Sequence, residues 1–133
     1  MGIGYYVFYL VGISGKGRGI TGARATAAVL NQTRPRLIGT NMLTVFPNSE
    51  LAVEIASGRW EEEGEVEKYR EVQELVRGLT ITTEFAMGGA SNAVFVAGRL
   101  PGQASEIVAA LDQVIDRVGE DELRRYRTGL RHL

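Results

Sequence analysis

The chain has 133 residues, of which 44% are apolar and 23% charged, and its formal net charge at pH 7 is −1. This length and composition are typical of a globular protein, so residues 1–133 are predicted to form a single domain with a buried core. The near-neutral charge provides no global field to attract nucleic acid or an acidic membrane, and neither is expected as a partner. Without cysteine, the chain cannot form disulfides or hold zinc or an iron–sulfur cluster through thiolates.

The start of the chain shows neither a membrane span nor an export signal. The longest apolar run, residues 5–11, is too short to cross a bilayer. The first residues lack the basic start and the cleavage site of a signal peptide. We therefore expect a cytoplasmic protein.

The first half of the chain predicts a strand, a helix and a second strand. Residues 5–13 are aromatic and β-branched without polar alternation, which is typical of a strand in a parallel sheet that is covered on both faces. A glycine-rich loop leads into an alanine-rich helix that Thr21 would cap and Pro35 would stop. Residues 37–45 predict the next buried strand. Together these segments form a βαβ unit, so the two strands are expected to be parallel neighbours.

The second half alternates between helical and extended patterns. The predicted elements are a short helix, a longer helix, two strands and two C-terminal helices, at residues 50–57, 61–77, 79–87, 93–97, 107–118 and 120–131. The glutamates at 61–65 are interpreted as a solvated helix start, where the helix dipole favours negative charge. The arginines of the last helix are interpreted in the same way, as favourable charge near a helix C-terminus.

The glycine-rich loop is a candidate phosphate site. Residues 17–22 match the pattern G-x-G-x-x-G, which binds the pyrophosphate of a dinucleotide when it joins a strand to a helix. The acidic residue expected about 20 positions later is absent from residues 37–44. A P-loop is excluded because Lys16 is followed by Gly17 rather than by Ser or Thr. A flexible connection and a nucleotide-contacting loop over residues 12–22 both stay open.

Four polar residues and one histidine are the other candidates. Ser91 and Asn92 follow two glycines; they form either a polar turn or a pair that reaches into a substrate pocket. Asn41 and Thr44 lie within a buried strand, so their side chains either bond locally or line a cavity. His132 is the only histidine and has no second histidine or cysteine beside it, so no metal ligand and no catalytic residue is assigned.

Several segments, taken in order, resemble one known family. They cover residues 10–17 (LVGISGKG), 25–31 (ATAAVLN), 38–51 (IGTNMLTVFPNSEL), 58–60 (GRW), 89–92 (GASN) and 98–101 (GRLP). Over nearly the whole chain their order resembles the C-terminal part of radical S-adenosylmethionine proteins, in the broad group that includes relatives of oxygen-independent coproporphyrinogen oxidase. Of that family's pattern G-x-I-x-G-x-x-E, this chain has Ile13 and Gly15, with Val11 and Arg18 at the outer positions.

The resemblance implies an α/β fold, a partial (β/α) barrel with a parallel βαβ core and C-terminal helices. It implies that the missing N-terminal half of the barrel is the partner, and that this half carries the C-x-x-x-C-x-x-C loop that binds a 4Fe–4S cluster. S-adenosylmethionine and the cluster would belong to the intact oxidoreductase-like enzyme, with no cofactor expected on this chain alone. The chain would shape the cofactor and substrate pocket and be inactive by itself.

The resemblance also implies where S-adenosylmethionine contacts would lie, toward the carboxyl ends of the barrel strands. The expected contact residues are Gly12, Ile13, Ser14, Gly15, Asn41 and Thr44. Two other functions stay open: a stand-alone nucleotide-binding α/β module that uses the loop at residues 12–22, and an interaction domain without a small-molecule site.

A barrel that is cut in two leaves one strand edge unpaired. Here that strand is residues 5–11, which hold no charge or proline to discourage pairing with another chain. We expect side chains such as Val7, Tyr9, Leu37 and Met42 to be partly uncovered. The chain is therefore predicted to form a homo-oligomer through this edge or face.

Overall fold

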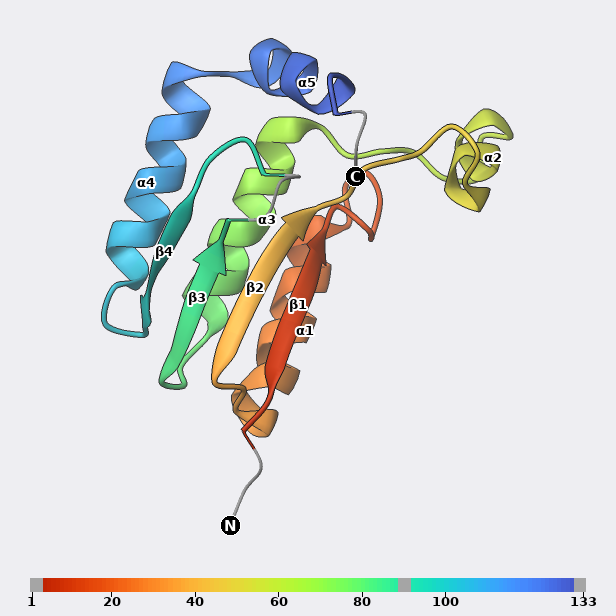
Figure 1. The fold of residues 1–133 in the computed structure, drawn as a ribbon. Coiled ribbons are helices and arrows are strands. Elements are labelled where there is room, and N and C mark those ends of the chain that lie inside the picture. Colours follow the sequence, from red (N-terminus) through yellow and green to blue (C-terminus); the bar gives the residue numbers. More distant parts are fainter. Residues whose placement is uncertain (1–3, 89–91, 131–133) are drawn as a thin grey trace.

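The computed structural model describes residues 4–88 and 92–130. This part of the chain forms an α/β fold with one four-stranded mixed sheet and five helices (Figure 1). In chain order the elements are β1 (Tyr6–Val11), α1 (Gly19–Thr33), β2 (Leu37–Met42), α2 (Glu50–Ala56), α3 (Glu65–Gly78), β3 (Thr83–Met87), β4 (Val96–Leu100), α4 (Ala104–Arg117) and α5 (Glu120–Thr128).

The strands follow the order β1-β2-β3-β4. β1 and β2 are parallel neighbours, with Tyr6 beside Leu37 at one end and Val11 beside Met42 at the other, as predicted. β3 is parallel to β2, and β4 is antiparallel to β3. The last reversal follows from the short connection at residues 88–95, because a parallel crossover needs about a dozen residues or more. The sheet is therefore open, with β1 and β4 as its edges. The topology does not show the expected partial barrel.

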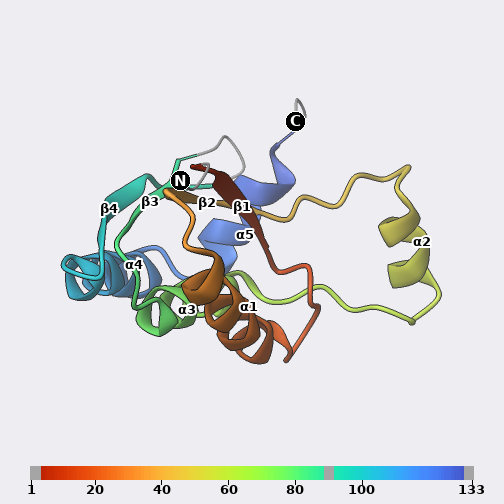
Figure 2. The same cartoon turned by 90° about the horizontal axis from the view of Figure 1, so that it is seen from below.

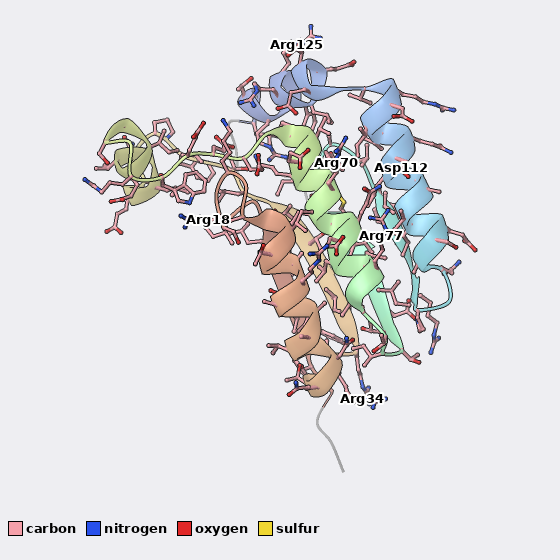
Figure 3. The ribbon with its side chains drawn as sticks, turned by 180° about the vertical axis from the view of Figure 1, so that it is seen from behind. Arg18, Arg34, Arg70, Arg77, Asp112 and Arg125 are labelled. Atoms are coloured by element: carbon pink, nitrogen blue, oxygen red, sulfur yellow. The ribbon has the colours of Figure 1, made fainter. Side chains whose placement is uncertain are left out.

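Helices α1, α3 and α4 cover one face of the sheet, and no helix of the described residues covers the other (Figures 2 and 3). The core lies in this single layer, where Ile38 and Phe85 of the strands meet Val72 and Leu111 of the helices. Small residues let α1 and α3 approach closely, since a Cβ on Gly78 would lie 2.9 Å from the Cβ of Ala27. The helix layer therefore accounts for Ala23 and Ala27 of α1, which are buried, whereas Ala25 and Ala28 are exposed.

The uncovered face of the sheet is apolar on β1. Tyr6, Phe8 and Leu10 are 68%, 72% and 41% exposed, and they alternate with residues that point toward the helices. By the strand register, the open face comprises Tyr6, Phe8, Leu10, Leu37, Gly39, Asn41, Glu84, Ala86, Ala97 and Arg99. Phe95 precedes β4, and its ring lies against Gly88, the residue that follows β3.

The side chains that are uncovered match the expectation only in part. Val7 and Tyr9 are half-buried, but they pack against the core on the helix side of the sheet. Met42 is buried in the core, so the expectation for this residue was wrong. Because strand side chains alternate between faces, it is Tyr6, Phe8 and Leu10 that are bare, while Leu37 is half-buried on the open face.

Other differences concern where elements begin. α1 starts at Gly19, and Thr21 lies inside the helix rather than capping it. The strand expected at residues 93–97 begins at Val96, and the helix expected from residue 61 begins at Glu65. Helix α2 projects away from the rest, and none of its residues is buried (Figures 1 and 2). Among the residues described, no helix is both long and apolar enough to cross a membrane.

The position of the core predicts how two apolar truncations differ. Phe85→Ala should lower the free energy of unfolding by about 3–5 kcal/mol, because the ring is buried between the sheet and the helices. Val29→Ala, on the outer side of α1, should change it by less than about 0.5 kcal/mol. Urea denaturation of both variants is the measurement, and similar losses would place the core elsewhere.

Candidate functional site at the carboxyl edge of the sheet

The predicted contact residues lie at the carboxyl ends of β1 and β2. The segment from Gly12 to Gly15 directly follows β1, Asn41 lies in the last part of β2, and Thr44 follows its end. The two segments stay side by side past the strands, because the Leu43 N–H donates to the Val11 carbonyl at 2.9 Å. Helix α5 runs across this same edge (Figure 1). The structure thus brings the two groups of predicted residues to one edge of the sheet.

A buried ionic network lies at this edge. Lys68 is fully buried, and its Nζ is 2.9 Å from carboxylate oxygens of both Glu62 and Glu65. Arg127 of α5 is also buried, and its Nε donates to both oxygens of Glu65 at 3.0 and 3.1 Å. Removing one partner of such a network leaves an uncompensated buried charge, which typically costs about 3–5 kcal/mol. The network therefore fixes α5 to the start of α3.

The sequence interpretation missed this network. Glu63, Glu65 and Arg127 are buried, so reading the glutamates as a solvated helix start and the arginines as simple dipole partners was wrong for these three. A signal was present, because Glu65 and Lys68 stand three apart on the helical stripe that continues to Val72. Charged residues on an apolar stripe indicate a buried pair.

Glu71 holds the start of the glycine loop. Its carboxylate accepts hydrogen bonds from the Tyr9 hydroxyl at 2.6 Å and from the Gly12 N–H at 3.2 Å. Burial raises the pKa of Glu71, and the two hydrogen bonds only partly offset the rise. Burial, together with the bond to Glu71, also raises the pKa of Tyr9. The Gly12 amide is therefore already occupied by a carboxylate of the same chain.

The next part of the loop is occupied in the same way. The Gly17 N–H donates to Glu63 at 2.6 Å, and the Lys16 N–H donates to the Glu61 carbonyl at 2.9 Å. The Lys16 ammonium pairs with the Glu61 carboxylate at 2.6 Å. A phosphate at this loop would need the same amides and would meet these carboxylates. The arrangement gives no support to a nucleotide site at residues 12–22.

Gly15 is where the loop contacts the segment after α2. Its φ is +83°, and a Cβ there would lie 2.9 Å from the Trp60 indole Nε1 and 3.3 Å from the Glu61 carbonyl. A larger residue at Gly15 would therefore displace Trp60, so such a variant cannot report on cofactor contacts alone. Gly17 also has a positive φ, of +75°, but nothing lies within 4 Å of its Cβ position.

Three of the predicted residues have side chains that are accessible or make no hydrogen bond. Asn41 is half-buried on the open face, and its side chain makes no hydrogen bond within the described ranges. Ser14 is half-buried, and its hydroxyl likewise has no hydrogen-bond partner there. Ile13 is 48% exposed. Ser14 and Asn41 do not face one ligand position, because the Ser14 hydroxyl lies beside Gly22 of α1 whereas Asn41 lies on the open face. A ligand on the open-face side of this edge would therefore meet Asn41 rather than Gly12.

Thr44 belongs to a different surface. It lies on a cavity of about 500 Å³ between the segment after β2, the start of α3 and α5. The lining residues are Thr44, Val45, Phe46, Pro47, Glu62, Glu65, Arg124, Arg127, Thr128 and Leu130. Each charged group on this lining is paired within the protein, for example Arg124 with Glu120 at 2.8 Å.

The Asn92 side chain bonds to the backbone of β2 rather than reaching into a cleft. Its Nδ2 donates to the Thr40 carbonyl at 2.9 Å, beyond the last residue of β2 that is paired with β3. Its own carbonyl accepts the Tyr126 hydroxyl at 3.2 Å, which ties α5 to the loop. Its Oδ1 is buried without a partner in the part of the chain that is described. The other pocket candidate, Ser91, lies outside the described residues.

Glu120 caps α3 from a distance. Its two carboxylate oxygens accept the N–H groups of Glu65 and Val66, each at 2.8 Å, at the start of that helix. Burial alone would raise the pKa of Glu120, but these two bonds and the one from Arg124 outweigh it and hold the pKa below its usual range. The carboxylate form of Glu120 therefore stabilises the junction of α3 and α5.

Comparisons with known proteins identify no relative for this arrangement. The chain matches no protein-family model, no curated protein and no solved structure at a significant level. Within residues 4–88 and 92–130, no group of three or more His, Asp or Glu side chains is placed to hold a metal ion.

The Glu120 cap predicts a pH-dependent loss of stability. Glu120→Gln should lower the free energy of unfolding at pH 7 by about 1 kcal/mol, because the side chain is more than a third exposed and solvent screens its charge. The folded pKa lies below the unfolded value, so the contribution is complete above about pH 4.3 and disappears as pH falls through the folded pKa. Urea denaturation at neutral and acid pH is the measurement.

Glu122→Gln provides the control for this experiment, since Glu122 is exposed on the same helix. It should leave stability unchanged at both pH values. A difference between Glu120→Gln and the unsubstituted chain that persisted in acid would show that the Glu120 charge plays no part.

The glycine loop predicts a contrast between two alanine variants. Gly17→Ala should cost about 1 kcal/mol through its positive φ alone. Gly15→Ala should cost more, because it also meets Trp60. Trp60 is the only tryptophan in the chain, so its emission spectrum reports the displacement directly. Equal stability losses and an unchanged spectrum in Gly15→Ala would remove the contact with Trp60 from the description of the loop.

Proposed function

We propose that this chain is the C-terminal portion of a radical S-adenosylmethionine oxidoreductase-like enzyme, in which it forms one wall of the cofactor and substrate pocket. The observation that carries the proposal is the one-sided sheet, with parallel strands, helices on one face and candidate contact residues at the carboxyl edge. In an α/β barrel the helices lie outside, the inner face is enclosed, and the site lies at the carboxyl ends of the strands.

The two edges of the sheet differ in strand direction. Both β1 and β4 are edge strands, but only β1 belongs to the parallel part of the sheet, because β4 is antiparallel to β3. Parallel strands from an N-terminal barrel half would add beside β1 and curve over the open face. Tyr6 and Phe8 would then lie inside the barrel, and the Asn41 amide would face the enclosed pocket.

The residues of this chain do not fit the iron–sulfur cluster of the family. Such clusters are held by cysteine thiolates, and the chain has none. The cluster ligands would therefore have to come from the N-terminal half. S-adenosylmethionine fits in part, because the Asn41 side chain is unbonded and Ile13 is half exposed at the carboxyl edge, while Gly12 is occupied by Glu71 and Ser14 lies beside α1. When bound, this cofactor is the source of the radical in the family's chemistry.

The alternative of a stand-alone nucleotide-binding module has less support. The loop amides it would use are bonded to Glu63 and Glu71, two carboxylates that would repel a phosphate. No contact at residues 12–22 favours it over the barrel proposal.

The proposal is tested on the polypeptide as the cell makes it, purified without oxygen. It should carry a 4Fe–4S cluster and cleave S-adenosylmethionine under reducing conditions, whereas the 133-residue chain reconstituted with iron and sulfide should hold no cluster. In the cluster-containing protein, Asn41→Ala should weaken S-adenosylmethionine binding by about 3–10-fold, the loss of one hydrogen bond.

Asn48→Ala is the matched control, because Asn48 is an exposed amide in the loop before α2. It should leave binding unchanged. A native polypeptide without a cluster would refute the proposed function. A cluster-containing protein that binds equally well with Asn41→Ala would keep the family but remove Asn41 from its site.

A further inference from the structure

We propose that in the 133-residue chain the open face is an interface for a second copy, with the two sheets packed face to face. This inference does not depend on the proposed function, since it concerns what covers the face when this chain is alone. It rests on the area of the exposed patch, on the charge of that patch and on the position of α2 beside the β1 edge.

The patch is large enough to support a dimer. Tyr6 and Phe8 are mostly exposed, and Phe95 is 75% exposed. With roughly 200 Å² for a whole aromatic side chain, these three expose on the order of 400 Å². Leu10 adds to this area. Two copies would therefore bury on the order of 1,000 Å² together, the lower limit for a specific interface.

The charge of the open face permits self-association. Its only charged members are Glu84 and Arg99, which pair with each other at 3.5 Å on β3 and β4. A two-fold dimer brings the same patch against itself, so a patch without net charge meets no net repulsion from its copy. The Asn41 amide has both donors and an acceptor and is equally compatible with a second copy of itself.

Packing through the face is favoured over pairing through the β1 edge. Edge pairing would join backbones but leave Tyr6 and Phe8 exposed, because strand side chains stand normal to the sheet. Helix α2 also projects on the β1 side of the molecule, near the carboxyl end of that strand (Figures 1 and 2). Face-to-face packing, with sheets about 10 Å apart, covers the aromatic side chains of both copies.

Sedimentation velocity across a dilution series tests the proposal. The unsubstituted chain should be a dimer that dissociates on dilution, and Phe8→Glu should be a monomer throughout the series. Val29→Glu is the matched control, because Val29 is 57% exposed on the outer side of α1, and it should dimerise like the unsubstituted chain. Circular dichroism melts confirm that each variant is folded, and Leu10→Ser replaces Phe8→Glu if the latter is not.

Three results would overturn the proposal. The first is an unsubstituted chain that is monomeric at every concentration, whether or not a separate barrel half binds it. The second is a dimer that survives both Phe8→Glu and Leu10→Ser, which would place the contact at the β1 edge or elsewhere. The third is equal dissociation of Val29→Glu, which would show an effect of added charge rather than of position. None of these results bears on whether the native polypeptide contains a cluster.

Discussion

In the part of the chain that the structure describes, helices pack against only one face of the sheet, and the rest of the structure depends on this constraint. The aromatic side chains of the other face expose on the order of 400 Å², whose burial would contribute about 10 kcal/mol at roughly 25 cal/mol per Å². That gross figure, before the costs of association, equals the net stability of a typical domain, about 5–15 kcal/mol. The exposed area therefore provides a large driving force for a second layer over the open face, against which the costs of association count, whether that layer is a barrel half in a longer protein or a second copy of this chain.

The carboxyl edge is organised by charges that the chain supplies to itself. Glu63 and Glu71 occupy amides of the glycine loop, and Glu65 joins Lys68 to Arg127, so that α3, α5 and the loop after β1 hold one another in place. Satisfied networks of this kind rigidify the groups around them. The Asn41 amide lies outside this network, on the part of the edge that continues into the open face.

The sequence predicted the elements whose signals are local. The apolar patterns and the intervening alanine-rich helix indicated that β1 and β2 are parallel neighbours, and helical spacing located α4. It did not reveal the pairing of Glu65 with Arg127, because the partners are 62 positions apart. Nor did it show that β1 is covered on one face only, since a strand with apolar residues on both faces has the same pattern whether or not a second layer is present. Of the predicted contact residues, the structure leaves Ile13, Ser14 and Asn41 accessible and gives Gly12 a structural bond, and the pocket candidate Asn92 likewise makes structural bonds.

The covering of the open face can be measured directly by thiol labelling, because the chain has no cysteine of its own. Ala97→Cys places a small thiol on the open face, and Ala28→Cys places one on the exposed side of α1. We predict that Ala97→Cys reacts much more slowly than Ala28→Cys in concentrated solution and that the difference disappears on dilution. Equal rates at every concentration would show that nothing covers the face, and protection that persists on dilution would show that the chain covers it by itself.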